Sequence, residues 1–142
     1  MQDKPRPLVG IGVMVFKNGK VLIGKRKGSH GENEYAWPGG HLEHAESIID
    51  CATREVKEET GIEIQNIRFQ FVANVLKYLP KHYLHIGLIA DWEKGVPHVL
   101  EPEKVEEWIW CDLDSLPEAL FEMCKLQVKS LKTGQIFFDS KS

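Results

Sequence analysis

Three glutamates on one face of an expected helix constrain this chain more than any other feature. Residues 48–60 are expected to be helical, because Ser47 is a good N-cap and Gly61 supplies the glycine that commonly ends a helix. This helix carries glutamates at i, i+3 and i+4, namely Glu55, Glu58 and Glu59. Like charges at this spacing repel each other. The pattern indicates either a solvated acidic face or a site for a hard cation such as Mg²⁺, which prefers carboxylate oxygens.

The residues around these glutamates match a known motif at every fixed position. The matching residues are Gly40, Glu46, Arg54-Glu55-Val56, Glu58-Glu59 and Gly61-Ile62. With this spacing the segment resembles the Nudix box, so the chain resembles the Nudix hydrolases. The resemblance implies an enzyme that cleaves a nucleoside diphosphate linked to another moiety, with Mg²⁺ or Mn²⁺ as its cofactor.

The resemblance also implies roles for individual residues. Glu55 and Glu59 would be the principal metal ligands, and Glu58 would be a further ligand or a close neighbour. The backbone carbonyl near Gly39 would complete the set. Arg54 would orient the catalytic glutamates, although on the sequence alone it can equally pair with Glu58 at i, i+4 of the same helix.

The box does not fix the general base, because Nudix proteins differ in where this residue lies. Two acids in the later segment LEPEKVEEW are candidates for a late metal ligand or base, Glu101 and Glu103. We rank Glu103 ahead of Glu101 as the catalytic residue. The alternative is that both acids belong to a solvated loop.

A basic cluster follows the first expected hairpin. Apolar strands over residues 8–16 and 21–26 flank an Asn-Gly dipeptide, which is a strong signal for a tight turn. The cluster consists of Lys25, Arg26 and Lys27. Arginine binds phosphate with two parallel hydrogen bonds and lysine adds a point charge, so these are candidate substrate-binding residues. The alternative is a solvated strand end.

Further stretches resemble one subgroup of the family. GKRKGS, PGGHLE and EPEK followed by W-x-W are similar to the MutT-type nucleoside triphosphate diphosphatases. This resemblance implies the reaction NTP + H₂O → NMP + pyrophosphate, with Arg26 on the phosphates and His41 beside the substrate. Within this subgroup the chain is similar to the eukaryotic enzyme that acts on oxidised and thiopurine deoxyguanosine triphosphates. Trp37 stands where that enzyme has an aliphatic residue, so the preferred base stays open. The tryptophan either belongs to the core or stacks on a base.

Three other functions are weighed against the triphosphate reaction. Two belong to the same family: hydrolysis of nucleotide sugars such as ADP-ribose, and hydrolysis of dinucleoside polyphosphates. The third is a non-catalytic Nudix domain that only binds nucleotides. Such domains commonly lose glutamates of the box, and here all of them are present.

The order of the expected elements favours an α/β (α+β) fold with a mixed sheet between helices, as in the Nudix fold, in one domain over residues 1–142. The expected strands cover residues 8–16, 21–26, 67–76, 83–92 and 105–112. A second helix is expected to open at Leu116-Pro117 and to end before Gly134. Residues 28–34 are expected to be a loop, and the apolar tail at residues 136–138 either packs on the body or covers a partner.

Composition excludes several classes of function. The formal net charge is -3, which gives no support for general nucleic-acid binding, and no apolar run reaches the length of a membrane span. The N-terminal residues show no secretory signal. Three cysteines without C-x-x-C spacing indicate a reduced, cytoplasmic protein with free thiols. The family resemblance makes a homodimer an open expectation.

Overall fold

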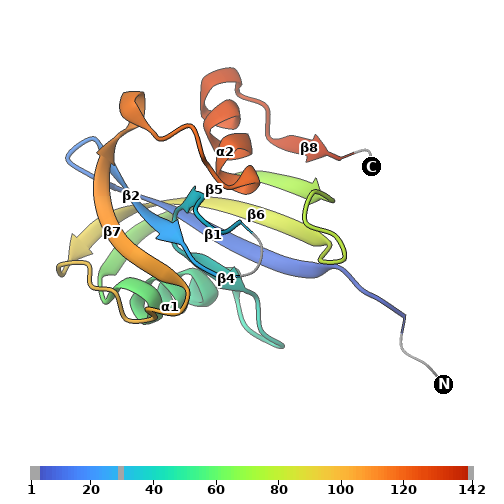
Figure 1. Ribbon diagram of the computed structural model, residues 1–142, viewed down its shortest axis with the longest axis horizontal. Helices are drawn as coiled ribbons and strands as arrows, with labels where there is room; N and C mark the ends of the chain where they lie inside the picture. The colour runs from blue at the N-terminus through green and yellow to red at the C-terminus, as the bar shows by residue number, and fades with distance from the viewer. Residues whose placement is uncertain (1–3, 29–30, 141–142) are drawn as a thin grey trace.

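The structure is a computed structural model that describes residues 4–28 and 31–140, within which eight strands form a mixed sheet that packs against two α-helices (Figure 1). The strands are β1 (Leu8–Lys17), β2 (Lys20–Arg26), β3 (Tyr35–Ala36), β4 (Gly39–His41), β5 (Glu63–Val75), β6 (Tyr83–Lys94), β7 (Val105–Asp112) and β8 (Phe137–Asp139). The helices are α1 (Ile48–Thr60) and α2 (Glu122–Thr133), with a 3-10 turn at Leu113–Ser115. The expected α+β class with a mixed sheet between helices is confirmed.

Strand β1 runs through the middle of the sheet, whose order is β3-β2-β1-β6-β5-β8. It is antiparallel to β2 and parallel to β6. The hairpin between β1 and β2 turns on Asn18 and Gly19, whose φ angles of 52° and 79° are those that a two-residue turn requires. The Asn-Gly signal in the sequence therefore predicted this hairpin correctly.

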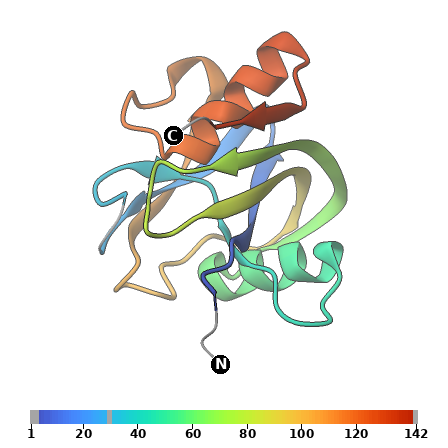
Figure 2. The same cartoon turned by 90° about the vertical axis from the view of Figure 1, so that its right-hand side faces the viewer.

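The two helices cover opposite faces of the sheet. Side chains alternate along a strand, and successive residues of β1 accordingly belong to different buried clusters. Val13 and Val15 pack in the cluster that contains Val56 of α1, whereas Met14 packs in the cluster that contains Cys124 of α2. In Figure 2, α1 lies below the sheet and α2 lies above it. Each face thus has its own core.

The edge of β1 that faces away from β6 is shared by two strands. At its far end, Phe16 and Lys17 pair with β2, whereas residues 10–12 pair with β4. Over most of its length, β2 pairs instead with β7 and β3. The sheet therefore divides between β2 and β4, and this division positions the site described below.

Helix α1 begins and ends where the sequence predicts. The Ser47 hydroxyl accepts a hydrogen bond from the N–H of Asp50 at 3.0 Å, and Gly61 ends the helix with a φ of 81°. The sequence predicts a buried stripe of Ile49, Ala52 and Val56 on this helix, which is partly wrong, because Ile49 is 49% exposed. The residues that are buried against the sheet are Cys51, Ala52, Val56 and Thr60.

The prediction that the second helix opens at Leu116-Pro117 is wrong. Leu116 is extended, and the segment before α2 runs alongside β3. The N–H of Tyr35 donates to the carbonyl of Ala119 at 2.6 Å, and the N–H of Phe121 donates to the carbonyl of Tyr35 at 2.8 Å. This tertiary pairing overrides the local helical pattern. The sequence predicts an apolar stripe of Leu120, Phe121, Cys124, Val128 and Leu131 for this helix. The buried residues of α2 are instead Met123, Cys124, Gln127 and Ser130, so Val128 and Leu131 lie at the margin of the buried face.

The apolar tail packs back on the body, which is one of the two expectations for it. Strand β8 lies parallel to β5, and Val72 stands opposite Phe137. Phe138 is buried at 8% exposure, whereas Ile136 and Phe137 are more than half exposed. Residues 1–3, 29–30 and 141–142 lie outside the described residues, so the expected loop at 28–34 is described only at its two ends.

Two further observations concern the helices and the cysteines. None of the helices in residues 4–28 and 31–140 is long and apolar enough to cross a membrane. Cys51, Cys111 and Cys124 are all free thiols, and Cys51 and Cys124 are buried.

Replacing Gly87 with alanine is expected to destabilise the protein by roughly 2–3 kcal/mol, because core overpacking costs about this much. A Cβ at this position would lie 1.9 Å from the ring of Phe71, which is fully buried. Chemical denaturation of Gly87→Ala measures the loss. The double variant Gly87→Ala/Phe71→Leu should be more stable than the sum of the single effects predicts, and strict additivity would contradict the assigned clash.

Candidate active site

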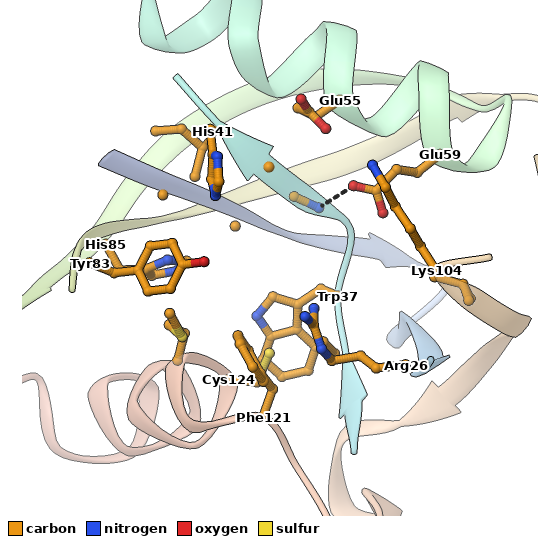
Figure 3. A pocket seen from close by; sticks show the side chains of 18 of the residues that line it. Arg26, Trp37, His41, Glu55, Glu59, Tyr83, His85, Lys104, Phe121 and Cys124 are labelled. Carbon is orange, nitrogen blue, oxygen red and sulfur yellow. Dashed lines mark hydrogen bonds between the residues drawn. The ribbon is translucent and has the colours of Figure 1, made fainter. Parts of the chain in front are cut away.

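A pocket of about 600 Å³ opens where the sheet divides, between α1 and the start of α2 (Figure 3). Its wall has three parts. Carboxylates of α1 and the backbone of β4 form one side, and lysine and arginine side chains from the end of β2 and the loop before β7 form another. Aromatic side chains close the end that lies against α2.

Arg54 gathers the carboxylates of the box. Its guanidinium binds Glu46 through two hydrogen bonds, with Nε at 2.6 Å and Nη2 at 2.9 Å, and this pairing lowers the pKa of Glu46 to about 2. Nη1 donates to Glu55 at 2.7 Å and to Glu58 at 3.3 Å. Glu43 lies 3.2 Å from Nη2. The pairing of Arg54 with Glu58 on the same helix and its contact with Glu55 are thus both present.

The carboxylates of Glu55 and Glu59 lie directly against the backbone of β4. Oε1 of Glu59 accepts a hydrogen bond from the N–H of Gly39 at 3.2 Å. A Cβ on Gly40 would lie 2.2 Å from Oε2 of Glu55, and a Cβ on Gly39 would lie 2.2 Å from the carbonyl of Ile11. Both glycines are therefore required by close approach, one to the carboxylate and one to β1.

The glutamates on the acidic side of the pocket resist ionisation. Burial and the neighbouring charge of Glu55 raise the pKa of Glu59 from its usual 4.5 to about 8. Burial also raises the pKa of Glu55, although Arg54 opposes this effect. The negative charge of Glu101 adds to the increase at both residues. Glu59 is therefore protonated at neutral pH unless a positive charge approaches it.

The donors on this side fit a hard cation better than any other group. Glu55 and Glu59 offer carboxylate oxygens whose mutual repulsion a divalent ion would relieve, and such ions prefer oxygen ligands. Among the described residues, however, no three histidine, cysteine, aspartate or glutamate side chains converge closely enough to hold a metal ion. Glu58 faces Arg54 with its side chain 52% exposed and does not line the pocket. Its role as a ligand stays a prediction.

The basic cluster divides between the pocket and the surface. Arg26 and Lys27 line the pocket, and the N–H of Lys27 donates to the carbonyl of Lys104 at 2.8 Å. Lys104 also lines the pocket, and its side chain extends alongside Glu59 (Figure 3). Lys25 lies outside the pocket and is 3.5 Å from Glu106. Two of the three predicted basic residues, Arg26 and Lys27, therefore line the cationic side of the pocket.

The end of the pocket near α2 is lined mainly by aromatic side chains. Trp37, Tyr83 and Phe121 all line it, and Trp37 is only 6% exposed. His85 is also buried there, and burial lowers its pKa to about 3, so the imidazole is neutral at physiological pH. The ring of His41 lies 5.7 Å from the ring of Tyr83. Both predicted substrate-binding residues of the box region, His41 and Trp37, are thus placed at the pocket.

The two candidate bases occupy different places. Glu103 lines the pocket and is exposed. Glu101 does not line the pocket and lies 3.6 Å from Lys104, but its charge acts on both Glu55 and Glu59. Neither acid is hydrogen bonded to the box glutamates, so the identity of the base stays a prediction.

Several residues of the pocket lining were not predicted as site residues, among them Lys104 and Phe121. Lys104 follows Glu103 directly, and a basic residue between candidate acids was a signal available in the sequence. Phe121 was assigned to the apolar stripe of the second helix. Its ring instead lies 4.1 Å from the guanidinium carbon of Arg26, a cation–π contact that depends on the extended segment before α2. No local signal could have indicated it.

Known proteins are similar to this chain in sequence and in fold. The chain is 30% identical over 117 residues to the NAD-capped RNA hydrolase NudC of Pseudomonas putida strain GB-1, with 82% of this chain and 41% of the relative covered. It is 33% identical over 116 residues to the NudC of Vibrio atlanticus strain LGP32, with 80% and 40% covered. The chain thus spans about two fifths of the length of these curated relatives.

Among solved structures, a MutT NUDIX hydrolase from Burkholderia pseudomallei superposes with a TM-score of 0.83 at 27% identity, covering 88% of this chain and 98% of that one. A NUDIX hydrolase from Nitrosomonas europaea superposes with a TM-score of 0.80 at 18% identity, covering 99% and 82%, and shows the fold alone. The family model of the NUDIX domain matches residues 6–131. The chain therefore belongs to the Nudix family.

Proposed function

We propose that this protein hydrolyses nucleoside triphosphates to nucleoside monophosphates and pyrophosphate, and that Mg²⁺ is its cofactor. One observation carries the proposal: a single pocket places carboxylates, cationic side chains and an aromatic end side by side. A nucleoside triphosphate has the matching parts, namely phosphates that bind a metal ion and cations, and a planar base. The similarity to a MutT NUDIX hydrolase supports the same choice.

Each side of the pocket has a task in this reaction. Arg26, Lys27 and Lys104 bind phosphate oxygens and offset their charge. Glu55 and Glu59 hold the metal ion, which supplies charge neutralisation and a more acidic water molecule when bound. Arg54 keeps the glutamate side chains in place.

The bond that breaks joins phosphorus to a bridging oxygen. A water molecule attacks one phosphorus of the linkage between the α- and β-phosphates, the bond from that phosphorus to the bridging oxygen breaks, and the bridging oxygen leaves with the other product. We assign the removal of the water's proton to Glu103, because it is the candidate base that lines the pocket.

A second candidate function is the hydrolysis of a dinucleotide such as NAD. It is favoured by the relatives named NAD-capped RNA hydrolase, which match this chain at 30–33% identity. Both reactions would use the same carboxylates. Their substrates differ in the group that is attached on the far side of the cleaved phosphate linkage. ADP-ribose and dinucleoside polyphosphates are further candidate substrates of this second kind.

A substrate panel tests the proposal directly. The protein is incubated with Mg²⁺ and canonical and modified triphosphates, ADP-ribose, NAD and dinucleoside polyphosphates, and the products are separated by ion exchange. We expect monophosphate and pyrophosphate from triphosphates, and a loss of about 10³-fold in kcat for Glu59→Gln, comparable to removal of a major electrostatic group. Turnover of NAD or ADP-ribose alone would select the second candidate. Nucleotide binding without turnover would identify a binding domain.

The raised pKa of Glu59 predicts how stability depends on pH. Folding keeps a proton on Glu59 that the unfolded chain releases above its usual pKa of 4.5. The metal-free protein should therefore lose stability as the pH rises from about 4.5 to about 8. Added Mg²⁺ should raise Tm more at pH 8 than at pH 6, because a bound ion favours the ionised carboxylate.

Thermal unfolding at both pH values, with EDTA or with Mg²⁺, measures this effect. Glu59→Gln is the matched control, because its amide does not ionise in this range. It should lose most of the difference between the two pH values. An identical pH dependence in the wild type and Glu59→Gln would assign the effect to another group.

Exchanging the two late acids one at a time tests the assignment of the base. Glu103→Gln should lower kcat by about 10²–10⁴-fold with little change in KM, since this is the usual contribution of a general base. Glu101→Gln is the control and should change kcat by only a few-fold. The reverse result would move the base to Glu101.

A further inference from the structure

Gln127 is a fully buried polar side chain on the face of α2 that packs against the sheet. An amide at such a position costs stability unless both of its polar atoms find partners. The apolar pattern expected for this helix does not include it. Its presence therefore calls for a physical reason.

The amide of Gln127 bridges the pocket wall to the sheet. Its Oε1 accepts a hydrogen bond from the indole Nε1 of Trp37 at 2.8 Å, and its Nε2 donates to the carbonyl of Leu88 at 3.0 Å. One end of the amide is thus anchored on β6, and the other end holds the side chain of Trp37. An aliphatic side chain of similar size would leave the indole N–H buried without this partner.

This arrangement determines what Trp37 offers to the pocket. Nε1 is the only polar atom of an indole side chain, and it is bonded to Gln127. Trp37 lines the pocket, so only its ring carbons contact an occupant.

We propose that Gln127 is a positioning residue, which acts through Trp37 to hold an apolar ring against the planar part of the substrate. The inference rests on the proposed function, in which the end of the pocket near α2 takes the base. Trp37 then strengthens the binding of any base without distinguishing bases by hydrogen bonds. An aromatic surface of this kind is tolerant of base identity, because every base has a flat face.

Gln127→Met tests the role, with Ser130→Ala as the matched control. Ser130 lies on the same buried face of α2, and its hydroxyl accepts a hydrogen bond from the amide of Gln70 at 2.8 Å, outside the pocket. Both variants should lower Tm. Only Gln127→Met should raise KM, by roughly three- to tenfold with kcat within about twofold, the range expected for losing one hydrogen bond that acts on binding. An equal KM in wild type and Gln127→Met would overturn the proposal.

A double-variant cycle separates action through Trp37 from a general effect on the fold. Trp37→Phe has no N–H for Gln127 to hold, so adding Gln127→Met to Trp37→Phe should not raise KM further. A full additional increase would show that Gln127 acts by another route. If Gln127→Met does not fold, Gln127→Asn keeps a buried amide that is too short to reach both partners, and it replaces Gln127→Met in both comparisons.

The KM values for the four canonical triphosphates provide the remaining measurement. Trp37→Phe should leave the rank order of their KM values unchanged, and a changed order would contradict recognition through ring carbons alone. A wild type that turns over nucleotides but shows none of these KM effects overturns the inference and leaves the proposed function intact. A wild type that neither binds nor turns over any nucleotide of the panel overturns both.

Discussion

The arrangement of the carboxylates on the acidic side of the pocket depends on the guanidinium of Arg54. This group is hydrogen bonded to Glu46, Glu55 and Glu58, and Glu43 lies within 3.2 Å. Several carboxylates this close together would repel one another, and one planar cation with five N–H groups relieves that repulsion while fixing their directions. Glu59 is the residue that Arg54 does not bind, and its pKa is raised to about 8. Burial and the charge of Glu55 cause this increase, and a positive charge beside Glu59 would favour its ionised form.

The backbone of β4 makes this arrangement possible. Gly39 and Gly40 pair with β1 while touching the glutamates of α1, and a Cβ at either position would lie 2.2 Å from a neighbouring atom, which leaves no space for a side chain. The helix and the strand therefore form one unit, in which carboxylate oxygens and peptide groups meet at contact distance. Because β4 takes one end of the β1 edge and β2 takes the other, the same pairing opens the sheet.

The second helix completes the pocket from the opposite face. The extended segment before α2 places Phe121 against Arg26, and Gln127 within α2 holds Trp37. These contacts connect the cationic side and the aromatic end of the pocket to the same element. In the proposed reaction, α1 supplies the glutamates that would hold the metal ion, and α2 shapes the part of the pocket that receives the base.

Local signals in the sequence determined α1, its caps, the first hairpin and the glutamate cluster, because each depends on residues within a few positions of one another. The sequence and its family resemblance also indicated part of the pocket lining, including Arg26, Lys27, Trp37 and His41. Only the tertiary structure decided that the second helix begins at Glu122, since the segment before it hydrogen bonds to β3, more than eighty residues away. The same is true of Lys25, which lies outside the pocket, and of Gln127, whose partners come from β6 and from the segment before β4. Pairing between distant segments has no local signature, because its stability comes from contacts that exist only once the chain has folded.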